Sequence, residues 1–321
     1  MKRALLLGAG GFLASHLSRR LLRDGWDVTG VVLDPTAPHV LQRLGETASE
    51  IRIVAGDAGD RTLLEQLVPA ADAIFPFAGV SGAADSVDRP LADLRANVEG
   101  QLTLLEVVRQ GAHPARIVFP GSRLQYGRVR RLPVDEDTPL APCSPYGVSK
   151  LAAEQYHLLY HEVHGVATTC LRISNPYGPF QDRVDRAFGV VGTFMAMAAR
   201  NEPIPLYGGG AQLRDYVYVD DLIAAVMLAV ADPVAVGRVY NVGGPRPVML
   251  REMAELVVET VGRGRVEHAP WEPVAARVET GDYVSDISRI GRELGWAPRC
   301  ELRDGLAATW EALDPRLYAI P

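Results

Sequence analysis

The first half of the chain alternates short, continuous apolar segments with longer segments whose apolar residues recur every three or four positions. The apolar segments predict buried strands at Ala4–Leu7, Val28–Leu33, Ile51–Val54, Ala73–Phe77, Arg116–Phe119 and Thr168–Ile173. The clearest predicted helices between them are Leu13–Arg23, Arg61–Val68, Leu91–Gln110 and Tyr146–His164. Strands without polar alternation are typical of a sheet covered on both faces. The pattern therefore predicts an α/β fold built on a doubly wound parallel sheet.

The alternation of strand and helix patterns becomes less regular after about residue 174, where glycine and proline become more frequent. Helical patterns return at Gly189–Arg200, Asp220–Val230 and Leu250–Val261. We expect a smaller, α-rich C-terminal domain there. The sheet domain is placed at residues 1–173 with a return near 214–241, and the smaller domain at 174–213 and 242–321.

Composition narrows the functional class. The 321 residues carry a net charge of −6, which disfavours nucleic acid as a partner. Three scattered cysteines fit a reducing cytoplasm, and no stretch approaches the roughly 20 apolar residues of a membrane span. His157, His161 and His164 share helical spacing without acidic or cysteine companions, so we expect a solvated helix face and no metal site. A cytoplasmic protein is expected.

A glycine-rich turn follows the first predicted strand and leads directly into a helix. Its spacing is Gly8-x-x-Gly11-x-x-Ala14. Gly8 allows the tight turn, Gly11 lets backbone N–H groups approach a pyrophosphate, and Ala14 lets the helix pack closely on the strand. A purely structural turn is the alternative, but the strand–turn–helix context is the one that a dinucleotide site requires.

Acidic residues follow the next two strands. Asp34 can accept hydrogen bonds from both adenosine ribose hydroxyls and would repel a 2′-phosphate, which favours NAD over NADP. Asp57 follows the third strand, where it could reach the adenine edge or instead cap the helix that begins near Asp60.

A phenol and an ammonium group stand four residues apart in Tyr146-Gly147-Val148-Ser149-Lys150. On a helix they share one face, and the lysine, with a nicotinamide cation, would lower the tyrosine pKa from about 10 toward neutrality. Such a tyrosine can act as a general base toward a sugar hydroxyl. Lys150 is the only lysine beyond Lys2. Ser122, at the end of another strand, could bond the same substrate oxygen and complete a triad.

Motifs along almost the whole chain make it similar to one known family. They include the glycine turn, Asn97-Val98-Glu99-Gly100, Tyr146…Lys150, Asn175-x-Tyr177-Gly178-Pro179, Arg214-Asp215-Tyr216 and Tyr240-Asn241-Val242-Gly243. The chain resembles the extended short-chain dehydrogenase/reductases, the NAD-dependent nucleotide-sugar epimerases and dehydratases. The resemblance implies a Rossmann domain that holds NAD and a C-terminal portion that holds a nucleoside diphosphate sugar.

The same resemblance implies roles for individual residues. The catalytic residues would be Ser122, Tyr146 and Lys150. NAD would be bound by Gly8, Gly11, Phe12, Leu13, Asp34, Asp57, Ala58, Phe77, Ala78, Gly79, Tyr146 and Lys150. The nucleotide sugar would be bound by Ser81, Arg123, Asn175, Arg183, Tyr207, Gln212, Arg214 and Arg277. Asn175 would lie near the diphosphate and Arg214 would pair with it.

One departure from the family pattern concerns the diphosphate. The family usually carries an arginine two residues before a Gly-Asp pair near the C-terminal end. In this chain the pair is Gly281-Asp282, Glu279 stands at the arginine position, and Arg277 is the nearest arginine. Arg277 is our candidate for the same role.

A second departure concerns the reaction. Members that eliminate water resemble one another in an Asp-Glu pair directly after the catalytic Ser or Thr, and UDP-glucuronate decarboxylases carry a Glu two residues after it. Here Arg123 and Leu124 occupy those positions. We therefore expect a UDP-sugar 4-epimerase that works through a 4-keto intermediate. A 4-keto-sugar reductase, another epimerase or dehydratase and a non-catalytic NAD sensor are the alternatives; Asp34 disfavours the reductase, and Tyr146 with Lys150 disfavours the sensor.

The sugar itself is suggested by Arg183, whose offset matches the arginine that uronate 4-epimerases place near the sugar C6 carboxylate. Arg183 and Arg186 could instead pair with Asp182 and Asp185 on a surface loop. Arg123 is a second candidate for the carboxylate. The expected substrates are UDP-glucuronate and UDP-galacturonate, with UDP-glucose as a further one. The family also leads us to expect a homodimer through residues 91–110 and 146–164.

Overall fold

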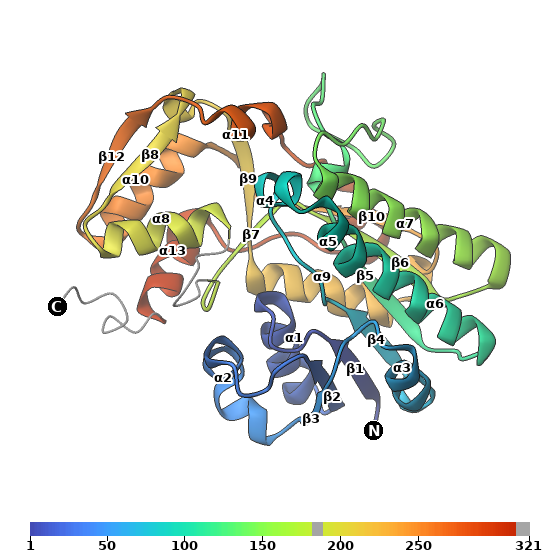
Figure 1. Ribbon diagram of the computed structural model, residues 1–321. Helices are drawn as coiled ribbons and strands as arrows, with labels where there is room; N and C mark the ends of the chain where they lie inside the picture. The colour runs from blue at the N-terminus through green and yellow to red at the C-terminus, as the bar shows by residue number, and fades with distance from the viewer. Residues whose placement is uncertain (182–188, 313–321) are drawn as a thin grey trace.

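The computed structural model describes residues 1–181 and 189–312 and is organised around a seven-stranded sheet (Figure 1). In spatial order the strands are β10 (Val239–Val242), β6 (Thr168–Ile173), β5 (Arg116–Ser122), β4 (Ala73–Pro76), β1 (Arg3–Leu7), β2 (Asp27–Val32) and β3 (Arg52–Ala55). Every neighbouring pair in this sheet is parallel. The prediction of a doubly wound parallel sheet is confirmed.

Helices cover both faces of this sheet. On one face lie α1 (Phe12–Arg23), α9 (Val219–Ala231) and α12 (Ser288–Leu294). On the other lie α3 (Arg61–Leu67), α6 (Gly100–Gln110) and α7 (Pro145–His164). Around the rim are α2 (Pro38–Leu44), α4 (Ala83–Asp88), α5 (Pro90–Leu94) and α11 (Pro273–Val278).

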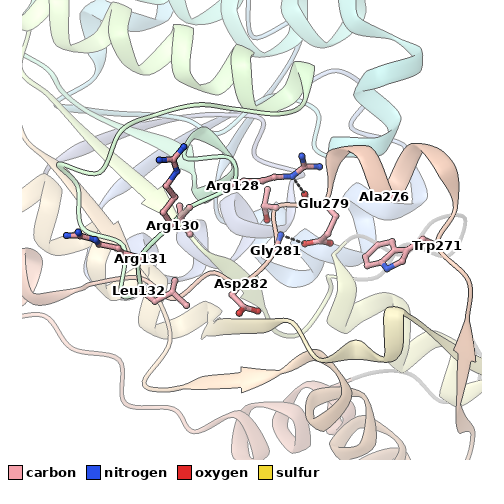
Figure 2. A pocket seen from close by; sticks show the side chains of 11 residues that line it. Arg128, Arg130, Arg131, Leu132, Trp271, Ala276, Glu279, Gly281 and Asp282 are labelled. Carbon is pink, nitrogen blue, oxygen red and sulfur yellow. Dashed lines mark hydrogen bonds between the residues drawn. The ribbon is translucent and has the colours of Figure 1, made fainter.

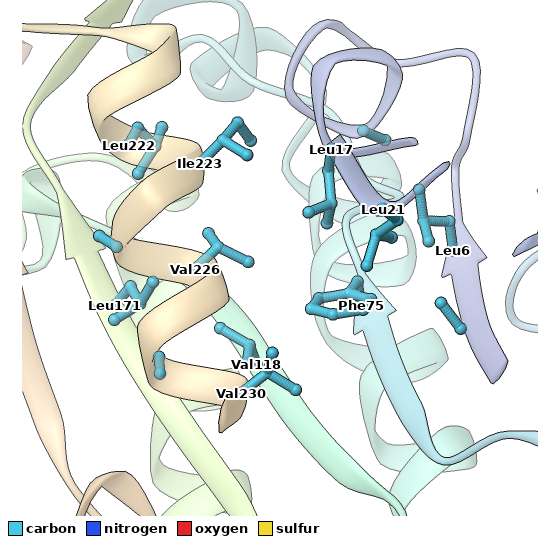
Figure 3. Close-up of a cluster of buried hydrophobic side chains, with 14 of the residues drawn as sticks. Leu6, Leu17, Leu21, Phe75, Val118, Leu171, Leu222, Ile223, Val226 and Val230 are labelled. Atoms are coloured by element: carbon cyan, nitrogen blue, oxygen red, sulfur yellow. The ribbon is translucent and has the colours of Figure 1, made fainter. Parts of the chain in front are cut away.

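The two-sided burial explains the unbroken apolar pattern of the strands. Leu6 packs with α1 and α9 on one face, whereas Leu5 and Leu7 pack with α3 and α6 on the other, because successive side chains alternate across a sheet. Figure 3 shows the first of these layers, in which Leu17 of α1 and Ile223 of α9 meet over the strands. Burying the strands on both faces fixes their register and so fixes where their ends lie.

The C-terminal portion has its own core beside the sheet domain. It contains α8 (Val190–Ala199), α10 (Leu250–Val261), α13 (Leu302–Glu311) and the parallel pair β8 (Pro203–Tyr207) and β12 (Arg265–Ala269). A three-stranded sheet of β11 (Pro247–Met249), β9 (Leu213–Tyr218) and β7 (Asn175–Tyr177) lies between this core and the main sheet (Figure 1). This portion is smaller than the sheet domain, and strands contribute to it as well as helices.

One local expectation needs refinement and another was wrong. The helix expected at 91–110 is present, but a π-helical turn at Arg95–Glu99 lies between α5 and α6. His157 does not lie on a solvated face, because it is fully buried between Thr168, Gln101 and the ring of Phe119. Its buried environment lowers the pKa of His157 to about 3, so it is a neutral core residue.

Within residues 1–181 and 189–312, no helix is long and apolar enough to cross a membrane. The same part of the chain contains no group of three or more His, Cys, Asp or Glu residues arranged to hold a metal ion.

Candidate active site and cofactor site

The predicted site residues gather at the carboxyl edge of the main sheet. Gly8 follows β1, Asp34 follows β2, Phe77 follows β4, and Ser122 ends β5. The strand order reverses between β1 and β4, because the chain runs outward to β3 before it returns to β4. In open α/β sheets this switch point leaves a crevice outside the carboxyl ends of the strands, where ligands bind.

The glycine turn between β1 and α1 has little room for side chains. Gly8 adopts φ +84°, and a Cβ there would lie 2.7 Å from the Cα of Ala78. Gly11 is the N-cap of α1, and among the described residues no side chain caps this helix end. The N–H groups of Phe12 and Leu13, in the first turn, are therefore directed at the crevice together with the positive end of the helix dipole. This is a suitable site for a pyrophosphate.

The two acidic residues have different local partners. Asp34 is exposed after β2 and accepts hydrogen bonds from the backbone N–H (2.8 Å) and hydroxyl (2.6 Å) of Thr36, which lower its pKa. Its carboxylate is therefore ionised at neutral pH. Asp57 accepts a hydrogen bond from the N–H of Gly59 at 2.8 Å, next to Ala58. Asp60, and not Asp57, caps α3.

An asparagine to which the sequence analysis gave no role lies against the turn after β4. The Oδ1 atom of Asn97 is buried without a hydrogen-bond partner among the described residues, and a Cβ at Gly79 would lie 2.5 Å from it. The Nδ2 atom of Asn97 donates to Asp93 at 3.1 Å. Asn97 belongs to the π-helical turn, a geometry that often marks functional sites. Its only sequence signal was the motif Asn97-Val98-Glu99-Gly100.

The candidate catalytic side chains come from the end of β5 and the start of α7. Ser144 caps α7 by accepting from the N–H of Gly147, so Tyr146 lies in the first helical turn and Lys150 one turn later. The Nζ atom of Lys150 donates to the carbonyl of Pro120 at 3.0 Å and lies 6.0 Å from the centre of the Tyr146 ring. The Ser122 side chain is close enough to Tyr146 to lower the pKa of its phenol. The structure thus brings the three predicted residues together.

Burial controls the protonation of both groups on α7. It raises the pKa of Tyr146 to about 12, and the Ser122 side chain opposes this rise. Burial also lowers the pKa of Lys150 to about 8, while the nearby Asp93 carboxylate raises it. The groups of the protein alone therefore do not lower the pKa of Tyr146 toward neutral pH. The lowering was expected from Lys150 acting together with a nicotinamide cation. At neutral pH the phenol is protonated and the lysine is mostly an ammonium ion.

A buried polar network supports Ser122 from behind. The N–H of Ser122 donates to Oε1 of Gln125 at 2.7 Å, and Nε2 of Gln125 donates to Glu154 at 2.8 Å. Glu154, fully buried on α7, pairs with Arg172 on β6 at 2.6 Å. Lys150 and Glu154 are one turn apart on α7. One helix therefore carries both the candidate catalytic lysine and the carboxylate that holds Gln125 against Ser122.

Arg123, directly after Ser122, reaches toward the C-terminal portion. It donates to Oδ1 of Asn175 at 3.1 Å and to the hydroxyl of Thr280 at 3.0 Å, and its guanidinium lies 5.4 Å from the centre of the Tyr283 ring. Burial and the neighbouring Arg214 lower the pKa of Arg123 to about 10, which still leaves it charged at neutral pH. Arg123 is therefore a half-buried cation directly after Ser122.

Arg214 lies on β9 and is almost fully buried. It donates to Oε1 of Glu279 at 2.5 Å and to the carbonyl of Gly281. Arg277 is exposed on α11, and its side chain has no ion pair within the described part of the chain. Glu279, and not Arg277, is therefore the residue of α11 and its C-terminal end that contacts Arg214.

A cavity of about 830 Å³ opens beside this pair (Figure 2). It lies between the segment 128–132 and the segment that runs from Trp271 to Asp282. Tyr207 stacks on Trp271 with ring centres 5.5 Å apart, and Gln212 is half-buried just before β9. Ser81 is exposed between β4 and α4, while Arg183 lies outside the described residues.

Comparison with known proteins agrees with this geometry. The sequence model described as "NAD dependent epimerase/dehydratase family" matches residues 4–243. The chain belongs to this family. It is 32% identical to a UDP-glucose 4-epimerase of Mycolicibacterium smegmatis (96% of this chain, 97% of the relative) and 31% identical to a dTDP-glucose 4,6-dehydratase of Streptomyces niveus (96% and 92%). A solved structure, MoeE5 in complex with UDP-glucuronic acid and NAD, has a TM-score of 0.84 and 28% identity (97% and 98%).

The protein is thus an NAD-dependent nucleotide-sugar epimerase or dehydratase. The residues present fit NAD on three observations: the glycine turn that admits no Cβ at Gly8, the uncapped first turn of α1, and the unpartnered Oδ1 atom of Asn97. Asp34 supplies the ionised carboxylate that suits ribose hydroxyls and disfavours a 2′-phosphate.

Proposed function

We propose that this protein is a UDP-sugar 4-epimerase whose preferred substrates are UDP-glucuronate and UDP-galacturonate. The observation that carries the proposal is the identity and position of Arg123. A half-buried guanidinium directly follows Ser122, where a dehydratase needs an acid to protonate the leaving hydroxyl. A cation that is partly shielded from water beside the proposed sugar site also suits a carboxylate at C6. UDP-glucose is the neutral alternative substrate.

In the proposed mechanism Tyr146 takes the proton from the C4 hydroxyl of the sugar. Ser122 bonds the same oxygen. Tyr146 must be a phenolate to take this proton, and the Lys150 ammonium, together with the positive charge of a bound nicotinamide, would stabilise that phenolate. NAD, which the Gly8 turn, the first turn of α1 and Asp34 would hold, would supply reversible hydride transfer at C4, so that the sugar can pass through a 4-keto form. Tyr146 then gives the proton back to the new C4 oxygen. No net oxidation occurs, which distinguishes this reaction from a reductase.

The 4-keto sugar must rotate between the loss and the return of the hydride at C4, while the nucleotide stays bound. We assign this anchoring to Arg214 and Asn175, with Tyr207 and Gln212 beside them. A guanidinium binds phosphate oxygens in a bidentate manner, so Arg214 can hold the diphosphate while the sugar end rotates. Asn175, whose Nδ2 atom donates to the carbonyl of Asp215 at 2.9 Å, is held in a fixed position next to Arg123.

The decisive experiment follows the C4 proton of UDP-glucuronate and, separately, of UDP-glucose by NMR, without added reductant. A galacto-configured product at equilibrium supports 4-epimerisation, and faster conversion of the uronate supports the substrate assignment. A new C6 methyl signal from dTDP-glucose would instead identify a 4,6-dehydratase. If neither UDP-sugar changes, the proposal is wrong.

Replacement of Arg123 by methionine tests the role of the half-buried cation. Losing a charged hydrogen-bond partner of about 1.5–3 kcal/mol is expected to lower kcat/KM for UDP-glucuronate by about 10- to 100-fold relative to UDP-glucose. Arg183→Ala is the parallel variant for the other candidate, and Arg130→Met is the control because Arg130 is exposed. An equal loss on both sugars in Arg123→Met and in Arg183→Ala would contradict a carboxylate clamp.

We also propose a homodimer formed through α5, α6 and α7. Apolar side chains are exposed on two of these helices, namely Leu91, Leu94, Val148, Leu159 and Val163. Sedimentation is expected to give twice the 34.8 kDa chain mass, and Val163→Glu is expected to shift the equilibrium to monomer, because it would place a charge in an apolar interface. Val234→Glu, at an exposed valine far from these helices in sequence, is the control. A monomeric wild-type protein would refute the dimer.

A further inference from the structure

The segment 277–281 is held by three arginines, two from the segment after β5 and one from β9. Arg128 donates to the carbonyls of Glu279 (3.0 Å) and Arg277 (2.9 Å). Arg123 donates to the side chain of Thr280, and Arg214 donates to the carboxylate of Glu279. These contacts give the segment one defined position, in which the Glu279 carboxylate lies directly on Arg214.

The contact between Glu279 and Arg214 is well formed. The Oε1 atom of Glu279 accepts from Arg214 at 2.5 Å and from the N–H of Gly281 at 2.9 Å. The side chain of Arg214 is 7% exposed and that of Glu279 is 26% exposed, so the pair is only partly screened by water. A carboxylate with two hydrogen-bond donors occupies the guanidinium in the same manner as a phosphate oxygen would.

We propose that Glu279 is an internal competitor for the diphosphate of the nucleotide sugar, and thereby sets the affinity of this site. The inference rests on the proposed function, because it takes Arg214 as the diphosphate-binding residue. An anionic ligand must displace the Glu279 carboxylate from Arg214, and a carboxylate that stayed in place would repel it. The guanidinium cannot serve both anions with the same N–H groups.

The surroundings of Glu279 offer a place for the displaced carboxylate. Glu279 lines the cavity of about 830 Å³, and the arginines of segment 128–131 line the same cavity (Figure 2). Arg130 and Arg131 are exposed, and the described residues give their side chains no ion pair. Positive charge near the cavity lowers the cost of moving a carboxylate off Arg214 without unfolding the segment.

The test measures the binding of UDP and of uridine to the purified protein by titration calorimetry. Glu279→Gln keeps an oxygen that can accept from Gly281 but removes the charge. It is expected to lower the Kd for UDP by about tenfold and to leave the Kd for uridine unchanged, because uridine carries no phosphate. Glu272→Gln is the matched control, since it removes the same charge from an exposed position directly before α11, and it is expected to change neither Kd.

A double-mutant cycle locates the effect at Arg214. In an Arg214→Met background, Glu279→Gln is expected to have no effect on the Kd for UDP, because there is no guanidinium left to release. Glu279→Ala is the second variant should the glutamine variant fold poorly. An unchanged or higher Kd for UDP in both Glu279 variants would overturn the competitor role, as would an equal gain for uridine.

The failures of the two proposals are distinguishable. If wild-type protein binds UDP and Arg214→Met raises the Kd for UDP, but the Glu279 variants bind no more tightly, the diphosphate assignment holds and the competitor role fails. If neither the wild-type protein nor any variant binds UDP, the proposed function fails, and the competitor role of Glu279 fails with it.

Discussion

Replacement of Tyr146 by phenylalanine is expected to lower kcat for UDP-sugar epimerisation by about 10²- to 10⁴-fold. The hydroxyl is the proposed base for the C4 proton, and it lies near Ser122 at the end of β5, whose side chain lowers its pKa. The ring itself stays, so packing at the start of α7 is preserved. The measurement is kcat from the NMR assay, with the NAD content of the purified protein determined in parallel.

Tyr156→Phe is the control, because it removes the same atom from a half-buried tyrosine on the same helix. It is expected to leave kcat and NAD content unchanged. A Tyr146→Phe protein that retained NAD and turned over at the wild-type rate would exclude Tyr146 as the base. A protein that lost NAD as well would show that the phenol acts mainly in cofactor binding.

Replacement of Glu154 by glutamine is expected to lower the free energy of unfolding by about 3–5 kcal/mol, because it leaves a buried guanidinium without its counter-ion. The side chains of Glu154 and Arg172 are 0% and 5% exposed, and three hydrogen bonds join them. Urea unfolding followed by tryptophan fluorescence measures the change. The substitution also removes the charged acceptor of Gln125, so the support of Ser122 is expected to weaken.

The exposed pair Arg61–Glu65 provides the comparison, since its side chains are 50% and 52% exposed. Glu65→Gln is expected to have a far smaller effect on unfolding, because water screens an exposed pair. The joint replacement Glu154→Leu with Arg172→Met is expected to recover much of the loss, since it leaves no buried charge unpaired. A Glu154→Gln protein as stable as Glu65→Gln would mean that the buried pair contributes little.

Features that depend on residues close together in the sequence were predictable from the sequence. The apolar segments identified six of the seven strands of the main sheet, because burial on both faces leaves a continuous apolar run. Strand β5 runs three residues beyond its predicted end, and β10 was not predicted. The spacing of Gly8, Gly11 and Ala14 predicted the turn into α1. Tyr146 and Lys150 were expected on one helix face, and the four-residue spacing places them one turn apart on α7.

Features made by residues far apart in the sequence required the tertiary structure. The pairing of Arg214 with Glu279 spans 65 positions and that of Arg123 with Thr280 spans 157. The π-helical turn at Asn97 and the burial of His157 likewise depend on what packs against them. Periodicity reports only which face of an element is apolar, whereas contacts between elements are set by how whole layers pack.

The sequence by itself therefore determined most of the sheet, the turn into α1 and the shared helix of Tyr146 and Lys150, since each follows from local geometry. Only the tertiary structure decided what surrounds the proposed diphosphate arginine. There the Glu279 carboxylate meets Arg214, and this contact depends on a guanidinium that a strand far away in the sequence brings to it.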